Sequence, residues 1–382
     1  MNEAKRAFVY GMAQSSLKHN IVKTEDGFFL RAGAHQFSSF WTRDFCWAAL
    51  GLLGIGELEC SKNHLNWLLT HLNDESLVAR LAEHGSSKRL VLLHTVFRFL
   101  PSQLKKISIS RRLRPEYLGE HRTPSQDSNL LVILVAFQIA KYDPAFLEDH
   151  KETILKVFSY YELHKRNGLI WQQKLSDWQD SAHRCGHTFY LNILYWRAAH
   201  LLVQKGWLNL DIERLRKSII DRFFQKETGL FKSHSSLNCI SLDGNLLALD
   251  WGFLSADDSL KLYNSLKMHP TWQKSYCTYP CYPRNEVSWT TKTVGLRHYH
   301  DEMIWSWLLG KSLKVARKFN DLKESDRLLD LLYDWLKRDG SVYEIYSPDT
   351  GRYFSSWLYQ SEHPFSWGAG VILESLEKQT GV

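Results

Sequence analysis

The sequence contains no run of roughly 20 apolar residues, the length that an α-helix needs to span a bilayer. Its start also lacks the apolar segment behind a basic head that is typical of a secretory signal. The six cysteines are dispersed through 382 residues, which excludes a small scaffold held together by disulfides. We therefore expect a soluble protein of a reducing compartment, the cytoplasm, with no membrane partner.

Charge of one sign is not concentrated in this chain. Lys and Arg exceed Asp and Glu by 48 to 41, a formal net charge of +7, and most of these charges are scattered among the predicted helices. The densest basic cluster contains Lys105, Lys106, Arg111, Arg112 and Arg114. A mild and dispersed excess of this kind indicates solubility, and we expect no nucleic-acid partner.

Low-complexity linkers are absent as well, so we expect residues 1–382 to form a single domain with a large core. Apolar residues recur at helical spacing in residues 3–17, 44–57, 61–72, 87–99, 127–141, 148–165, 187–204, 209–226, 255–267, 300–319, 321–337 and 366–379. Strand-like segments are short, at 27–31, 168–171 and 343–346, the last predicted to form a hairpin with 351–355. This element order favours an all-α toroid of helical hairpins with short β-hairpins in the loops.

Aromatic residues are abundant: they make up 13% of the chain and include 15 tryptophans. Many of the tryptophans stand near polar clusters, among them Trp41, Trp47, Trp171, Trp178, Trp251, Trp289, Trp305, Trp307, Trp357 and Trp367. Each one alone fits an amphipathic core position with its indole N–H at a rim. Together they favour a cleft whose walls stack on a carbohydrate.

Acidic residues accompany these aromatic segments at several points. Asp44 follows Arg43 just before an apolar helix, Asp127 opens another helix, and Asp177 and Asp180 flank Trp178. Each has an ordinary alternative explanation, because a carboxylate near a helix N-terminus caps it and complements its dipole. Glu344 lies in a strand-like segment ahead of a Trp-rich tail. Cleavage of a glycosidic bond needs a matched acid and base, which two such carboxyls can supply.

The densest polar and aromatic segment runs from His298 to Trp307. Three groups contain residue types that can bind a metal: His298, His300, Asp301 and Glu302; residues 183–187; and the Cys277–Cys281 pair. None has the paired spacing of a structural zinc site, so we expect no metal and no cofactor. Contact with substrate is the preferred interpretation.

Taken in order, these segments resemble the six-hairpin toroid glycosidases: the processing α-glucosidases of glycoside hydrolase family 63, the neutral/alkaline invertases of family 100 and the glucosidase domain of glycogen-debranching enzymes. The resemblance extends from Phe40 to Glu374. It rests on six segments, namely 40–53, 126–133, 177–198, 243–248, 299–307 and the run from Glu344 through Gln360 to Gly370. At Asp301-Glu302 the family has Asn-Gly instead.

The resemblance implies a role for each of these positions. Asp127 would be the general acid and Glu344 the general base, with Glu302 as a rival for the base. Substrate contacts would come from Trp41, Arg43, Asp44, Trp178, Asp180, His300, Glu302, Trp305, Gln360 and Trp367.

The implied protein is an (α/α)6 toroid that hydrolyses the glycosidic bond of an α-glucoside or small oligosaccharide with inversion, without metal or cofactor. Two alternatives stay open. One is a carbohydrate-binding or regulatory toroid without hydrolytic activity. The other is a sugar isomerase or epimerase on the same fold, with His298, His300 and Glu302 as proton carriers.

Overall fold

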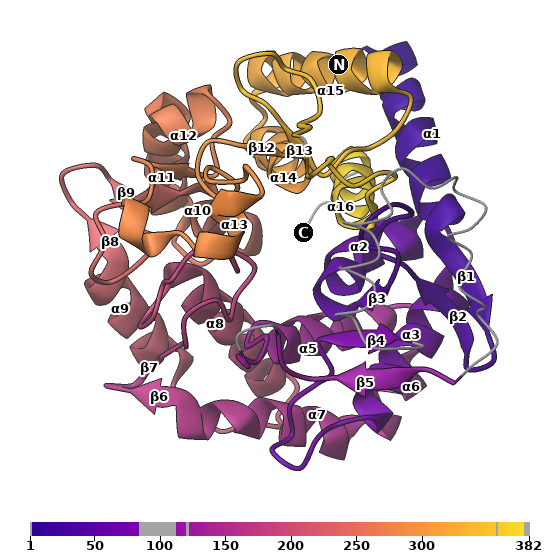
Figure 1. The fold of residues 1–382 in the computed structure, drawn as a ribbon. Helices are drawn as coiled ribbons and strands as arrows, with labels where there is room; N and C mark the ends of the chain where they lie inside the picture. The colour runs from indigo at the N-terminus through magenta and orange to yellow at the C-terminus, as the bar shows by residue number, and fades with distance from the viewer. Residues whose placement is uncertain (1, 84–111, 120–121, 357, 378–382) are drawn as a thin grey trace.

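The computed structural model describes residues 2–83, 112–119, 122–356 and 358–377, and within them the longer helices form two concentric rings (Figure 1). Each inner helix packs against the next and the last packs on the first, so the inner ring is closed. It contains α2 (Thr42–Gly54), α5 (Ser128–Ile139), α8 (Phe189–Gln204), α10 (Leu242–Trp251), α14 (Ser306–Lys318) and α16 (Ser366–Leu376). The predicted (α/α)6 toroid is confirmed.

The outer ring pairs one helix with each inner helix. It contains α1 (Glu3–Asn20), α3 (Leu58–Thr70), α7 (Lys151–Ser159), α9 (Ile212–Phe223), α11 (Ala256–Met268) and α15 (Leu322–Asp339). Shorter helices lie in the connections: α6 (Pro144–Asp149), α12 (Pro270–Gln273), α13 (Trp289–Thr293) and the 3₁₀ turns η2 (Tyr160–His164) and η3 (Arg284–Glu286). No helix in the described ranges is both long and apolar enough to cross a membrane.

The two rings follow from two kinds of apolar pattern. The outer helix α9 buries Leu215, Ile219 and Phe223, one residue per turn, and exposes its charged side chains. The inner helix α5, by contrast, is apolar on every side and buried along most of its length. A helix that is apolar all round is stable only when other helices surround it, which is the position of the inner ring.

Short antiparallel strand pairs connect the helices. They are β1 (Ile21–Thr24) with β2 (Gly27–Leu30), β4 (Leu81–Glu83) with both β3 (Phe40–Trp41) and β5 (Arg114–Glu116), β6 (Lys165–Arg166) with β7 (Leu169–Ile170), β8 (Phe224–Gln225) with β9 (Leu230–Phe231), β10 (Ile240–Ser241) with β11 (Thr278–Tyr279), and β12 (Ile304–Trp305) with β13 (Ile345–Tyr346). Three strands, β3, β10 and β12, lead directly into α2, α10 and α14. They therefore fix where the first turns of these inner helices lie.

Several elements depart from the prediction or fall outside the described residues, and the predicted helix 300–319 begins only at Ser306, after β12. Helix α10 was not predicted, because Gly244 and Asn245 in its first turn weaken the helical signal and only its buried surroundings stabilise it. The predicted helix 148–165 ends as α-helix at Ser159 and continues as a 3₁₀ turn. The strand β13 pairs with β12, and residue 353 forms only a single bridge to it. The predicted helix 87–99 lies outside the described residues.

Close backbone packing between α2 and α16 gives a test of the ring. A Cβ on Gly51 would lie 2.6 Å from both the Cα and the carbonyl oxygen of Gly370, where only backbone could move aside. We expect Gly51→Ala to lower the free energy of unfolding by about 1–3 kcal/mol, measured by urea denaturation. The matched control is Gly11→Ala on the exposed side of α1, where nothing lies within 4 Å and a small gain of about 0.4–1 kcal/mol is expected. Equal effects would contradict this packing.

Candidate active site

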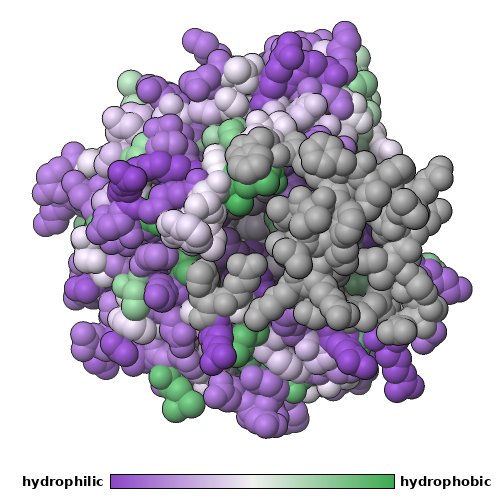
Figure 2. All heavy atoms as spheres, viewed as in Figure 1, coloured by the Kyte–Doolittle hydropathy of each residue, from purple (hydrophilic) through white to green (hydrophobic). Residues whose placement is uncertain are grey.

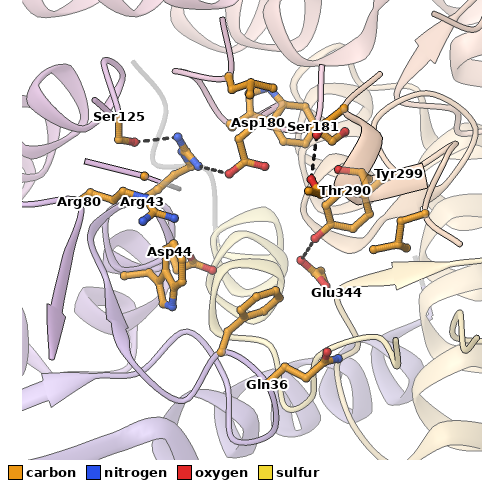
Figure 3. Close-up of a pocket in the computed structure, with 18 of the residues that line it drawn as sticks. Gln36, Arg43, Asp44, Arg80, Ser125, Asp180, Ser181, Thr290, Tyr299 and Glu344 are labelled. Carbon is orange, nitrogen blue, oxygen red and sulfur yellow. Dashed lines mark hydrogen bonds and ion pairs between the residues drawn. The ribbon is translucent and has the colours of Figure 1, made fainter. Parts of the chain in front are cut away.

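A cavity of about 420 Å³ opens where the inner helices begin. Arg43 and Asp44 from the first turn of α2, Trp305 from β12 and Trp367 from the first turn of α16 all line it, together with residues of the connecting loops. Figure 2 shows a hollow near the centre of this face, and Figure 3 shows side chains that converge on the cavity from several segments. The cavity is therefore formed by residues that lie far apart in the sequence.

Glu344 reaches the cavity from the residue just before β13. Its backbone N–H donates to the Glu362 carbonyl at 3.0 Å, and its own carbonyl accepts from Ser306 N–H at 3.0 Å. The Tyr299 hydroxyl donates to one carboxylate oxygen at 2.6 Å, and the Tyr359 hydroxyl donates to the other. Two hydrogen bonds thus fix the backbone of Glu344 and two fix its carboxyl group, and the residue is only 3% exposed.

Burial raises the pKa of Glu344 to about 8. The hydrogen bonds from Tyr299 and Tyr359 oppose this rise because they favour the ionised form, whereas the neighbouring carboxyls of Glu362 and Asp44 add to it. A carboxyl group whose pKa lies near neutrality can exchange a proton with substrate or water under physiological conditions.

Asp180 projects into the same cavity from the segment before α8 (Figure 3). Its side chain is 45% exposed, and one of its oxygens lies 3.4 Å from the Arg43 Nη1. The surrounding protein nevertheless removes enough water to raise the pKa of Asp180 above its ordinary value, although Arg43 opposes the rise. Asp180 and Glu344 are therefore two carboxyls of raised pKa that face one cavity.

A buried polar network holds the segment that carries Asp180. Asp177 accepts a hydrogen bond from the Gln179 backbone N–H at 2.9 Å and forms a fully buried ion pair with Arg184. The Trp178 indole N–H donates to Asp243 of α10 at 2.6 Å. These contacts tie the chain on either side of Trp178 to the inner ring, so the position of Asp180 is fixed by its neighbours.

Asp127 lies behind the cavity wall and does not line it. Its side chain is fully buried, and its two oxygens accept from the Arg43 Nε at 2.7 Å and Nη2 at 2.9 Å. Burial opposes the charge on Arg43, but the Asp127 carboxylate outweighs it and raises the pKa of Arg43 above its ordinary value. Arg43 occupies both oxygens of this buried carboxyl group, and the group has no path to a substrate in the cavity, so the geometry is against the predicted role of Asp127 as general acid.

On the opposite wall from Glu344, Asp44 points into the cavity from the first turn of α2 (Figure 3). Burial raises the pKa of Asp44 to about 7, while Arg43 opposes the rise. Beside it the Arg80 guanidinium stacks on the Trp41 ring at 4.6 Å, and both residues line the cavity. This wall offers a carboxyl, a cation and an aromatic face to a polar ligand.

The structure brings most of the predicted site residues together. The cavity is lined by the predicted Trp41, Arg43, Asp44, Trp178, Asp180, Trp305, Glu344 and Trp367. Three predicted contact residues do not line it. His300 is buried behind Trp305 and bonds Ser181 Oγ at 2.6 Å, Glu302 accepts from the Cys281 thiol at 2.7 Å, and the Gln360 carbonyl accepts from the Gln36 side chain.

Four of the tryptophans that we interpreted as sugar-stacking walls pack on one another instead. The Trp178 ring lies 4.9 Å from Trp307 and 5.2 Å from Trp305, and Trp307 stacks on Trp367 at 4.9 Å. All four are at most 3% exposed. Trp178, Trp305 and Trp367 also line the cavity, whereas Trp307 lies wholly in the core, so core packing accounts for much of the aromatic content.

No site role was assigned from the sequence to Tyr299 and Tyr359, which contact Glu344, or to Arg80, which lines the same cavity. Tyr359, which hydrogen-bonds Glu344, carries no motif signal of its own, since it only precedes Gln360 in the chain. Arg80 lies in a segment that was not singled out from the sequence. A local sequence pattern does not reveal such residues, because they come to the cavity from separate loops.

No family model matches this chain, and no curated protein matches it in sequence. Solved structures match over almost its whole length. A rhamnosidase from Klebsiella oxytoca with rhamnose bound superposes with a TM-score of 0.68 at 10% identity, over 98% of this chain and 64% of its own. A GH63 mannosylglycerate hydrolase from Thermus thermophilus gives 0.65 at 13% identity, over 96% and 99%. A glycosidase variant in complex with glucose gives 0.66 at 13% identity, over 98% and 99%.

This chain has the six-hairpin glycosidase fold. It spans 64% of the rhamnosidase chain and nearly all of the GH63 hydrolase, so the toroid itself is the shared part. Sequence identities of 10–13% show a shared fold and do not show a shared activity. Evidence for an activity must come from the residues of the cavity.

Proposed function

We propose that this six-hairpin protein is a glycoside hydrolase that cleaves its substrate with inversion at the anomeric carbon. The observation that carries the proposal is the pair Asp180 and Glu344, two carboxyls of raised pKa that project into one cavity from separate loops. Glycosidic hydrolysis uses such a pair, one as acid and one as base. The fold shared with solved glycosidases supports the same conclusion.

In the proposed reaction Asp180 replaces Asp127 as the general acid. Protonated Asp180 donates its proton to the glycosidic oxygen as the bond to the anomeric carbon breaks, and the alcohol leaves. Ionised Glu344 takes a proton from a water molecule, whose oxygen forms the new bond on the opposite face of the ring. An inverting enzyme needs about 6.5–9.5 Å between the two carboxyls so that this water fits. Tyr299 and Tyr359 orient Glu344 for this step.

For substrate we propose an α-glucoside or small oligosaccharide. The cavity is within the size range of small-molecule sites, and Asp44 and Arg80 provide polar contacts for hydroxyl groups. Purified protein should be screened against sucrose, trehalose, maltose, glucosylglycerate and, because one structural neighbour hydrolyses it, mannosylglycerate. Hydrolysis of one of these supports the proposal. Binding of sugars without cleavage of any glycoside would favour the non-hydrolytic alternative.

The isomerase alternative is not supported by the geometry. Its proposed proton carriers His298, His300 and Glu302 do not line the cavity. Burial moreover lowers the pKa of His300 below its ordinary value, and the ring is packed against Trp305. These residues would need a different cavity to reach a free sugar.

The pH profile tests the role of Glu344 as base. A base acts only when it is deprotonated, so kcat/KM should rise with pH through about 8, the pKa of Glu344. The Tyr359 hydroxyl stabilises the ionised form and lowers this pKa. Tyr359→Phe should therefore move the acidic limb of the profile up by about one pH unit, since a hydrogen bond to a charged group contributes about 1.5–3 kcal/mol.

The matched control is Tyr353→Phe, because Tyr353 stacks on Tyr343 at 4.2 Å and does not line the cavity. Its acidic limb should coincide with that of the unmodified protein. A limb that stays in place in Tyr359→Phe, or moves to lower pH, would contradict the assignment of Glu344 as base.

A further inference from the structure

Two loop segments outside the cavity bring four metal-ligating side chains together. Cys281 follows β11, and His298, Asp301 and Glu302 precede β12. The Cys281 sulfur, a ring nitrogen of His298 and a carboxylate oxygen of Asp301 all lie within 4.8 Å of one another. None of these four residues lines the cavity, so the cluster is separate from the proposed catalytic site.

The individual contacts within this cluster are short. The His298 Nδ1 lies 3.1 Å from Asp301 Oδ1 and 3.8 Å from Glu302 Oε2, and the Cys281 thiol donates to Glu302 Oε1 at 2.7 Å. In a tetrahedral zinc site with bonds of 2.0–2.3 Å, neighbouring ligand atoms are about 3.3–3.8 Å apart. Small side-chain rotations would therefore bring these donors to coordination distance around one ion.

Asp301 is held in place by the backbone around it. One of its oxygens accepts from the Tyr282 N–H at 3.2 Å and the other from the Glu302 N–H at 2.9 Å, and the side chain is only 1% exposed. Such outer hydrogen bonds are what orient ligands in metal centres. His298 and Glu302 are 35% and 34% exposed, so an ion can enter from solvent.

We propose that Cys281, His298, Asp301 and Glu302 bind a single zinc-class divalent cation. One thiolate, one imidazole and two carboxylates form a mixed donor set that suits Zn²⁺ or Co²⁺ and is too soft for Mg²⁺ or Ca²⁺. The ion would replace the proton that the Cys281 thiol now shares with Glu302, and it would displace the Arg297 Nη1, which lies 3.4 Å from the His298 Nδ1. From the sequence the two segments were considered separately and no metal was expected, because neither alone has the spacing of a zinc site, whereas the fold brings their side chains together.

The ion would have a structural role beside the cavity. It would cross-link the loop after β11 to the segment that leads into β12. That segment also contains Tyr299, which hydrogen-bonds Glu344. The site does not depend on the proposed hydrolysis, so the two can be tested separately.

The test uses the full-length protein, reduced and stripped with a chelator, and titrated with Zn²⁺ or Co²⁺ alone. We expect one equivalent of Zn²⁺ by calorimetry and, with Co²⁺, a thiolate-to-cobalt charge-transfer absorption. Cys281→Ser should abolish that absorption, and Cys281→Ser and His298→Ala should each weaken Zn²⁺ binding by at least about 100-fold. Circular dichroism spectra that match the parent protein ensure that each variant is folded.

The matched control is Cys185→Ser, which removes an exposed cysteine that lies near two other histidines in the sequence. It should bind both ions as the parent protein does. Loss of binding in Cys185→Ser, unchanged affinity in both Cys281→Ser and His298→Ala, or a failure of the parent protein to bind Zn²⁺ would each overturn the proposal.

Discussion

Replacing Glu344 by Gln is expected to lower kcat by about 10²–10⁴-fold, the usual contribution of a general base. The amide keeps the shape of the side chain and its oxygen can still accept from one of the two tyrosine hydroxyls, but it cannot take a proton from water. Because the base acts on the water and not on the leaving group, the loss should be similar for good and poor leaving groups. Steady-state kinetics with a glycosyl fluoride, which has a good leaving group, and an alkyl glycoside, which has a poor one, measure the two losses of kcat.

Glu302→Gln is the discriminating variant, since the sequence made Glu302 a rival for the base. Glu302 does not line the cavity, so a far smaller loss of kcat is expected. The reverse order, with Glu302→Gln inactive and Glu344→Gln near full turnover, would assign the base to Glu302.

Replacing Asp180 by Asn should produce a loss that depends on the leaving group. An alkyl alcohol leaves poorly without a proton, so kcat/KM for an alkyl glycoside should fall by about 10²–10⁴-fold. Fluoride needs no protonation by an acid, so the same variant should hydrolyse a glycosyl fluoride at close to the parent rate. This difference between substrates is the signature of a general acid and is measured on one protein preparation.

Asp127→Asn distinguishes the two candidates for the acid. Asp127 contacts Arg43 and does not line the cavity. The substitution should therefore change the hydrolysis rates of the alkyl glycoside and the glycosyl fluoride by the same factor. If instead Asp127→Asn showed the leaving-group dependence and Asp180→Asn did not, the assignment from the sequence would stand and ours would fall.

Much of the toroid could be predicted from the sequence because several outer helices leave a clear apolar stripe, as Leu215, Ile219 and Phe223 do in α9. Helix α10 escaped prediction because it is buried on most sides and begins with residues that disfavour helices. The conformation of such a helix is determined by the residues packed around it, so the local sequence pattern does not predict it.

The catalytic candidates divide in the same way. Glu344 became a candidate because its segment precedes a recognisable aromatic tail. We propose Asp180 in place of Asp127 as the acid, a choice that the sequence could not make because both are aspartates in segments that lead into an inner helix. Only the fold shows that Arg43 binds one of them from behind the wall and leaves the other facing the cavity. That choice depends on a contact between residues 84 positions apart.

The most direct test of the account is the stereochemistry of the first product. Proton NMR recorded in the first minutes of hydrolysis of an α-glycoside shows which anomer appears before mutarotation. If Glu344 activates water opposite a leaving group protonated by Asp180, the β-anomer should appear first. Initial release of the α-anomer would mean retention through a covalent intermediate and would contradict the proposed roles of the two carboxyls.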